Sequence, residues 1–151
     1  MLSAANLAPS WKNSQTPRFY VATGEKSKDA VREALPEFNR KNSENASAYI
    51  VTTVVLNRSG FDKDGTAVTE IGNGWGYYDL GLNNMALLLK ATELGISTLV
   101  MGIRDGEKLR KEFDIPKTEA VVSVIAVGYT DSEIVRPKRK SVEDFAKFYE
   151  D

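Results

Sequence analysis

The sequence contains neither cysteine nor histidine. Without cysteine the chain has no disulfide and no thiol nucleophile, and without either residue type it has no Cys/His zinc site, so no metal site is expected. Catalysis by a serine that histidine activates is excluded as well. Any acid–base or redox chemistry must therefore come from a cofactor, carboxylates, lysine, tyrosine or bound water.

An excess of one charge and long hydrophobic runs are also missing. Charged residues make up 27% of the chain and nearly cancel to a net charge of −1, which gives no electrostatic reason to expect nucleic acid or an anionic membrane as a partner. No apolar run approaches the ~20 residues of a membrane span, and the N-terminus lacks the pattern of a signal peptide. We expect one cytoplasmic domain over residues 1–151, large enough to bury a core.

Four segments rich in β-branched and aromatic residues predict strands, at 18–22, 49–56, 96–101 and 120–129. The run at 49–56 is almost continuously β-branched, so it should be central and covered on both faces. A leucine-rich helix at 77–94, ended by Gly95, should be buried nearly all round, with part of it facing another subunit. These elements predict an α+β fold with a mixed sheet, flanking helices and the long helix at the centre.

Weaker signals predict the shorter helices and a long connection. Residues 27–35 have helical spacing, with Ser27 as N-cap and Pro36 after the end, and Ser141 with Asp144 predicts the start of a last helix. The connection at 57–73 is long enough to control substrate access. Its final glycines do not have the spacing of a dinucleotide-binding turn, so that kind of site is rejected.

Residues 8–17 predict a rigid loop, because two prolines and several polar side chains exclude a helix interior or a central strand. An apolar helical segment precedes the loop and a strand follows it, so the fold interior should clamp it on both sides. The amides of Asn13 and Gln15 each offer donors and acceptors, which suits a planar polar ligand.

The same loop resembles the flavin-contacting loop of the FMN-dependent nitroreductase family, which includes NAD(P)H:FMN oxidoreductases, at Ala8-Pro9-Ser10, Asn13 and Gln15. Residues 94–102 resemble the family's L-G-L-G-T-x-W-M-G segment. Residues 120–129 resemble its late strand, and residues 137–141 its basic C-terminal motif. The Arg-Arg-Ser-x-Arg segment that grips the FMN phosphate in relatives does not precede the loop, so we expect an N-terminally short chain, a truncated reading of a longer protein, with weak FMN binding.

The resemblance implies an FMN enzyme that takes electrons from NADH or NADPH and passes them from flavin N5 to a nitroaromatic, quinone or similar small molecule by a ping-pong mechanism. It implies a homodimer whose interface completes the site, and no catalytic side chain. The cofactor-binding residues it implies are Pro9, Ser10, Asn13, Gln15, Asn39, Asn42, Met101, Gly102, Lys138 and Arg139. Among these, the backbone at 101–102 would bind flavin N5 and the two basic residues the phosphate.

Alternatives stay open at this point. Asn39 and Asn42 equally fit a solvated helix face, and the basic run at 136–140 taken alone is typical of solvated surface. A competing hypothesis is a shortened, flavin-poor and non-catalytic dimeric member of the family with a binding or structural role. A third reading is a flavin-dependent enzyme for reductive dehalogenation or flavin fragmentation, since fold alone does not fix the reaction.

Overall fold

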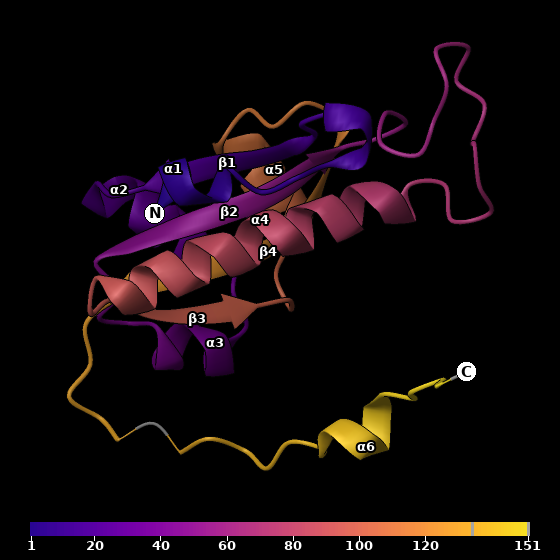
Figure 1. Ribbon diagram of the computed structural model, residues 1–151. Helices are drawn as coiled ribbons and strands as arrows, with labels where there is room; N and C mark the ends of the chain where they lie inside the picture. The colour runs from indigo at the N-terminus through magenta and orange to yellow at the C-terminus, as the bar shows by residue number, and fades with distance from the viewer. Residues whose placement is uncertain (134, 151) are drawn as a thin grey trace.

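Four strands form one sheet in the computed structural model, which describes residues 1–133 and 135–150. The order across the sheet is β1-β2-β4-β3 (Figure 1). The strands are β1 (Pro17–Ala22), β2 (Ala48–Val55), β3 (Ser97–Met101) and β4 (Glu119–Gly128). Each strand begins and ends within one residue of the range that its composition predicts, because β-branched runs bounded by polar turns mark strands clearly.

Strand β2 is central, between β1 and β4, as predicted. The α+β class holds, but the expected mixed sheet is wrong: the three strand pairs of the described ranges are antiparallel. The return path of the chain explains this. Helix α4 (Gly74–Glu93) carries the chain back across the sheet, so β3 runs in the same direction as β2, and β4 then pairs between them in the opposite direction.

Helices cover both faces of the sheet (Figure 1). Besides α4 the chain has the helices α1 (Leu2–Ala5), α2 (Glu25–Glu33), α3 (Glu37–Asn42) and α5 (Gly106–Glu112), with a short 3-10 helix η1 (Trp11–Asn13). A last helix, α6 (Val142–Phe145), lies on the C-terminal tail, away from the sheet (Figure 1). On one face Leu87 of α4 packs against Ile50 and Ile125 of the sheet. On the other face Val31 of α2 and Leu109 of α5 join the larger core. Within the described residues no helix is long and apolar enough to cross a bilayer.

Helix boundaries differ from prediction where local capping decides them. Helix α2 begins at Glu25 with Gly24 as N-cap, so Ser27 is not the cap; it lies in the first turn and its Oγ donates to the Gly24 carbonyl. Helix α4 begins at Gly74, earlier than the predicted 77, and ends as expected before Gly95, whose φ is +70°. The predicted capping box of Ser141 with the N3 aspartate is confirmed at α6.

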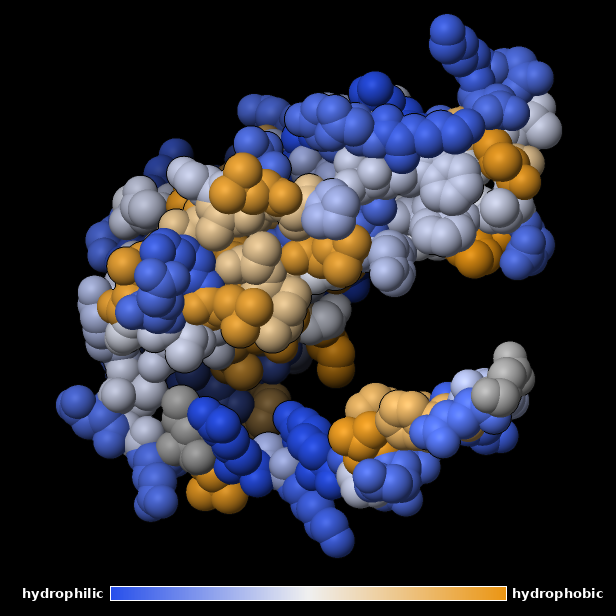
Figure 2. All heavy atoms as spheres, in the orientation of Figure 1, coloured by the Kyte–Doolittle hydropathy of each residue, from blue (hydrophilic) through white to orange (hydrophobic). Residues whose placement is uncertain are grey.

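Within the single chain, helix α4 is buried on one side only, and the expected burial of its other faces against a second subunit stays a prediction. Leu87 faces the sheet and is 0% exposed, whereas Met85 and Leu89 are 51% and 59% exposed. Figure 2 shows apolar surface gathered over the face that α1 and α4 form, where Leu2 and Leu7 are also exposed. One sheet in a chain this size covers only the stripe of the helix that faces it.

A buried polar cluster joins β1, β2 and β4. The Glu119 carboxylate accepts hydrogen bonds from Tyr20 Oη at 2.9 Å and from Thr53 Oγ1 at 2.5 Å. Burial, reinforced by the hydrogen bond to Glu119, raises the pKa of the Tyr20 phenol from 10.0 to about 12. The native state therefore keeps a proton that the unfolded chain loses at lower pH.

We expect this phenol to make stability fall as pH rises from about 10 to about 12, because in that window the unfolded chain binds one proton fewer than the native state. The phenol contributes its full stabilisation at pH values below its pKa in the unfolded chain. That stabilisation is lost as the pH rises through its pKa in the folded protein. Urea unfolding of the wild type and of Tyr20→Phe from neutral to alkaline pH checks this. The stability gap between the two proteins should narrow above pH 10, and a gap that stays constant contradicts the assignment.

Candidate functional site

The loop at 8–17 leads from α1 into β1 and contains η1. Lys12, Asn13 and Gln15 have φ values of 45°, 55° and 48°. Residues other than glycine rarely adopt this left-handed region, which costs about 1–3 kcal/mol for each. The surrounding structure must therefore hold the loop in its shape.

The Asp79 carboxylate of α4 binds the backbone of this loop. The backbone N–H of Trp11 donates to both oxygens of Asp79, at 3.1 and 3.2 Å. Ser59 Oγ donates to the same carboxylate, and the hydroxyls of Ser14 and Ser59 lie 3.0 Å apart. At the far end of the loop, the Val55 N–H donates to the carbonyl of residue 16. The expectation that the interior clamps the loop on both sides is confirmed.

A groove of about 360 Å³ opens beside this loop. Its lining consists of Leu2, Asn6, Ala8, Ser10, Gln15, Pro17, Arg18, Phe19 and Asn83. Ser10 Oγ accepts a hydrogen bond from the Gln15 backbone N–H at 3.0 Å, so the Ser10 hydroxyl proton is available to a ligand. Pro9 and Asn13 adjoin the groove in sequence and are exposed. The structure thus brings Ser10 and Gln15 together in a hollow of mixed polarity.

Asn39 and Gly102 form a second group, at the end of β3. Met101 is buried in the core and Gly102 is exposed directly after it. Asn39 Nδ2 donates to the Ile103 carbonyl at 3.1 Å, which joins α3 to this backbone. Arg104 Nη1 donates to the Gly102 carbonyl at 3.0 Å. The side chain of residue 104 therefore fixes the backbone that was predicted to face the flavin.

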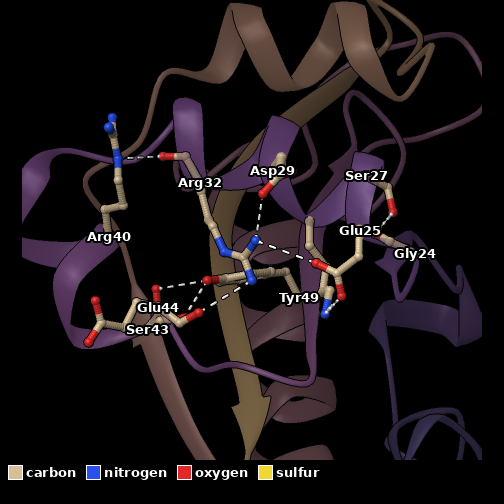
Figure 3. A network of polar contacts seen from close by, with 10 residues as sticks. Gly24, Glu25, Ser27, Asp29, Arg32, Arg40, Ser43, Glu44 and Tyr49 are labelled. Atoms are coloured by element: carbon tan, nitrogen blue, oxygen red, sulfur yellow. Dashed lines mark hydrogen bonds and ion pairs between the residues drawn. The ribbon is translucent and has the colours of Figure 1, made fainter.

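Helix α3 is braced by a polar network at its C-terminus (Figure 3). Tyr49 Oη of β2 donates to the Ser43 carbonyl at 2.5 Å, and the Arg32 guanidinium lies 5.8 Å from the Tyr49 ring. Arg40 Nε donates to the Arg32 carbonyl at 3.1 Å. These contacts fix α3, and with it Asn42, which lines a separate groove of about 430 Å³ beside the start of β3.

The basic residues lie on a tail that leaves the body of the molecule after β4 (Figure 1). Lys138 and Arg139 are exposed, and Arg139 Nη1 donates to the Pro137 carbonyl at 2.9 Å, a contact within the tail. The ten predicted residues therefore fall in separate places within one chain: the loop groove, the end of β3 with α3, and the tail.

Sequence reasoning missed the residues that position the loop and the end of β3, namely Ser59, Asp79 and Arg104. It also missed Asn83, which lines the groove. Asp79 had a usable signal, because it is an acidic residue in the first half of a largely apolar helix, and buried carboxylates are rare unless they are bonded. Ser59 and Arg104 had none, since their partners are distant in sequence or are backbone carbonyls.

Comparison with known proteins identifies the fold. A family model described as the nitroreductase family matches residues 1–129. A putative nitroreductase from Exiguobacterium sibiricum, solved in complex with FMN, is 21% identical, with a TM-score of 0.83 over 98% of this chain and 83% of that one. A nitroreductase family protein from Streptococcus pneumoniae is 21% identical, with a TM-score of 0.80 over 98% and 86%.

An enone reductase of gut-bacterial fatty acid saturation is 20% identical, with a TM-score of 0.83 over 97% of this chain and 83% of that one. No curated protein sequence matches the chain. The structural similarities confirm the fold that the loop and strand motifs implied.

Proposed function

The chain belongs to the nitroreductase family, and we propose that it is an FMN-dependent oxidoreductase. The observation that carries this proposal is the groove beside residues 8–17, where Ser10 keeps a hydroxyl proton to donate and Gln15 lies next to it. A volume of about 360 Å³ is within the usual range for small-molecule sites. The FMN complex of the Exiguobacterium relative, which has the same fold, adds support.

The residues present fit a flavin. The Ser10 hydroxyl and the amides of Asn13 and Gln15 would bind the polar edge of the ring, and Pro9 would restrict the backbone that presents Ser10. Asn39 would adjoin the ring near Gly102, which is exposed and whose carbonyl is bonded by Arg104. Asn42 would add a contact from the same short helix.

When bound, FMN would accept a hydride from NADH or NADPH and then pass electrons to a nitroaromatic, quinone or similar acceptor, in a ping-pong cycle. The protein binds and orients, and Lys138 and Arg139 would neutralise the phosphate. Water or the acceptor itself supplies protons, which suits a site without histidine.

We also propose that two chains form one site. The predicted cofactor residues lie in separate places within one chain, and the exposed leucines of α4 leave an apolar face uncovered. Light scattering should show a homodimer at micromolar protein. A monodisperse monomer that nevertheless holds FMN tightly would contradict this arrangement.

The test of function is a titration of the purified protein with FMN, followed by NADH and NADPH oxidation with a nitroaromatic or quinone acceptor. Saturable FMN binding and acceptor-dependent oxidation are expected. A protein that does not bind FMN would instead be a non-catalytic member of the family. A protein that binds FMN but reduces only halogenated substrates would be of the dehalogenase type.

Ser10→Ala and Asn13→Ala should each weaken FMN binding about threefold to tenfold without unfolding the protein, since a neutral hydrogen bond contributes about 0.5–1.5 kcal/mol. Fluorescence titration measures the affinity, and circular dichroism checks the fold. Thr118→Ala, at an exposed residue that lines neither groove, serves as the matched control. Unchanged affinity in both loop variants would remove the loop from the flavin site.

A further inference from the structure

The carboxylate of Asp79 is buried without a counter-charge. The side chain lies on α4, and the residue is 2% exposed. None of the ion pairs of residues 1–133 and 135–150 includes it. Its hydrogen bonds come instead from the Trp11 backbone N–H and from Ser59 Oγ. Burying a carboxylate is costly, and these bonds offset that cost only in part.

The two donors belong to different loops. Trp11 opens η1 in the loop at 8–17, and Ser59 lies in the connection between β2 and α4. Ser14 extends the network, because its hydroxyl lies 3.0 Å from that of Ser59. Asp79 is therefore the point at which one rigid helix fixes both loops.

The position of this anchor matters for the residues that follow it. Lys12, Asn13 and Gln15, with their left-handed φ values, come directly after the bonded N–H of Trp11. A backbone in this region relaxes to ordinary φ when its surroundings no longer hold it. Relaxation would turn the side chains of Asn13 and Gln15 away from their present directions.

We infer that Asp79 is a positioning residue for the loop at 8–17, and that it sets FMN affinity through the Trp11 backbone rather than by touching the cofactor. The effect of Asp79 on FMN affinity rests on the proposed function. The claim that Asp79 holds the loop concerns the protein without ligand and is tested separately.

The two tryptophans of the chain provide a direct reporter of the loop. The rings of Trp11, on the loop, and Trp75, on α4, lie 4.6 Å apart at an interplanar angle of 48°. Two indoles this close and tilted couple their transitions and give a circular dichroism couplet. The couplet disappears if the loop moves away from the helix, and it needs no flavin.

The experiment compares Asp79→Ala, Asp79→Asn and the control Lys90→Ala, which alters an exposed ion pair on the same helix. Asp79→Ala should lose the couplet and bind FMN about tenfold or more weakly, because only a minor fraction of the protein then has the competent loop. Asp79→Asn should keep the couplet and stay within about threefold of the wild type, since its amide oxygen still accepts from Trp11 and its NH₂ can donate to Ser59. Lys90→Ala should match the wild type in both.

An Asp79→Ala protein that keeps both the couplet and the wild-type FMN affinity overturns the inference. If that variant does not fold, Ser59→Ala replaces it, and a couplet and affinity equal to the wild type would again overturn it. If Asp79→Ala or Ser59→Ala loses the couplet but binds FMN as tightly as the wild type, Asp79 does not set FMN affinity. Failure of the wild type itself to bind FMN refutes the proposed function, while the couplet still decides whether Asp79 holds the loop.

Discussion

Replacing Lys138 and Arg139 together with alanine is expected to weaken FMN binding by about two to four decades. Each charge-assisted hydrogen bond to a phosphate contributes about 1.5–3 kcal/mol, so losing two costs about 3–6 kcal/mol. Both side chains are exposed, and Arg139 bonds only within its own tail among the described contacts. The two substitutions should therefore cost the folded protein little stability, and their main effect should be on FMN affinity. FMN titration measures it.

The matched control is Arg136→Ala with Lys140→Ala, which removes the same charge from the same tail. It should change FMN affinity by no more than about threefold, because exposed charges without a specific partner contribute little and are screened by salt. Equal losses in the two double variants would mean that the tail acts by its total charge. The assignment of the phosphate to Lys138 and Arg139 would then be wrong.

Leu87→Ala is expected to lower the free energy of unfolding by about 2–5 kcal/mol, the usual cost of removing a fully buried leucine. Leu87 is 0% exposed and joins α4 to Ile50 and Ile125 of the two central strands. The cavity would lie between α4 and the two central strands. Urea unfolding at several protein concentrations measures the change.

Leu89→Ala, two residues along the same helix and 59% exposed, makes the same chemical change on the opposite side. For a single chain it should cost far less than Leu87→Ala. If a second chain covers this face, its cost will depend on protein concentration, whereas the cost at Leu87 will not. A Leu89 variant that is as unstable as the Leu87 variant at all concentrations would contradict the burial described for α4.

The strands could be predicted from the sequence because each is a compact run of residues that fit a pleated, buried surface. The direction of pairing could not. Whether β4 enters beside β2 or at an edge depends on where α4 returns the chain, which is a long-range property. The Ser27 cap failed for a local reason, since Gly24 offers the extended backbone that an N-cap needs and starts α2 earlier.

The site was predictable only in part, and for a similar reason. The polar residues of the loop at 8–17 stand together in sequence, so their shared groove could be anticipated. The carboxylate that holds the loop lies 68 positions away from Trp11, and no local pattern connects the two. The apolar periodicity of α4 shows how many of its faces are apolar but not which of them the sheet covers, so the covering of the remaining face by a second subunit stays a prediction.

The sheet order also has a consequence for synthesis on the ribosome. Thr52 of β2 pairs with Ser123 of β4 across 71 positions, and at about 5–20 residues per second the ribosome needs on the order of 4–14 s to supply them. Until β4 is made, the edge of β2 that β4 occupies in the finished fold has no partner. An unpaired β-branched edge invites association with other nascent chains. Yield in a heterologous host should therefore respond to temperature and chaperone supply more strongly than the stability of the finished protein does.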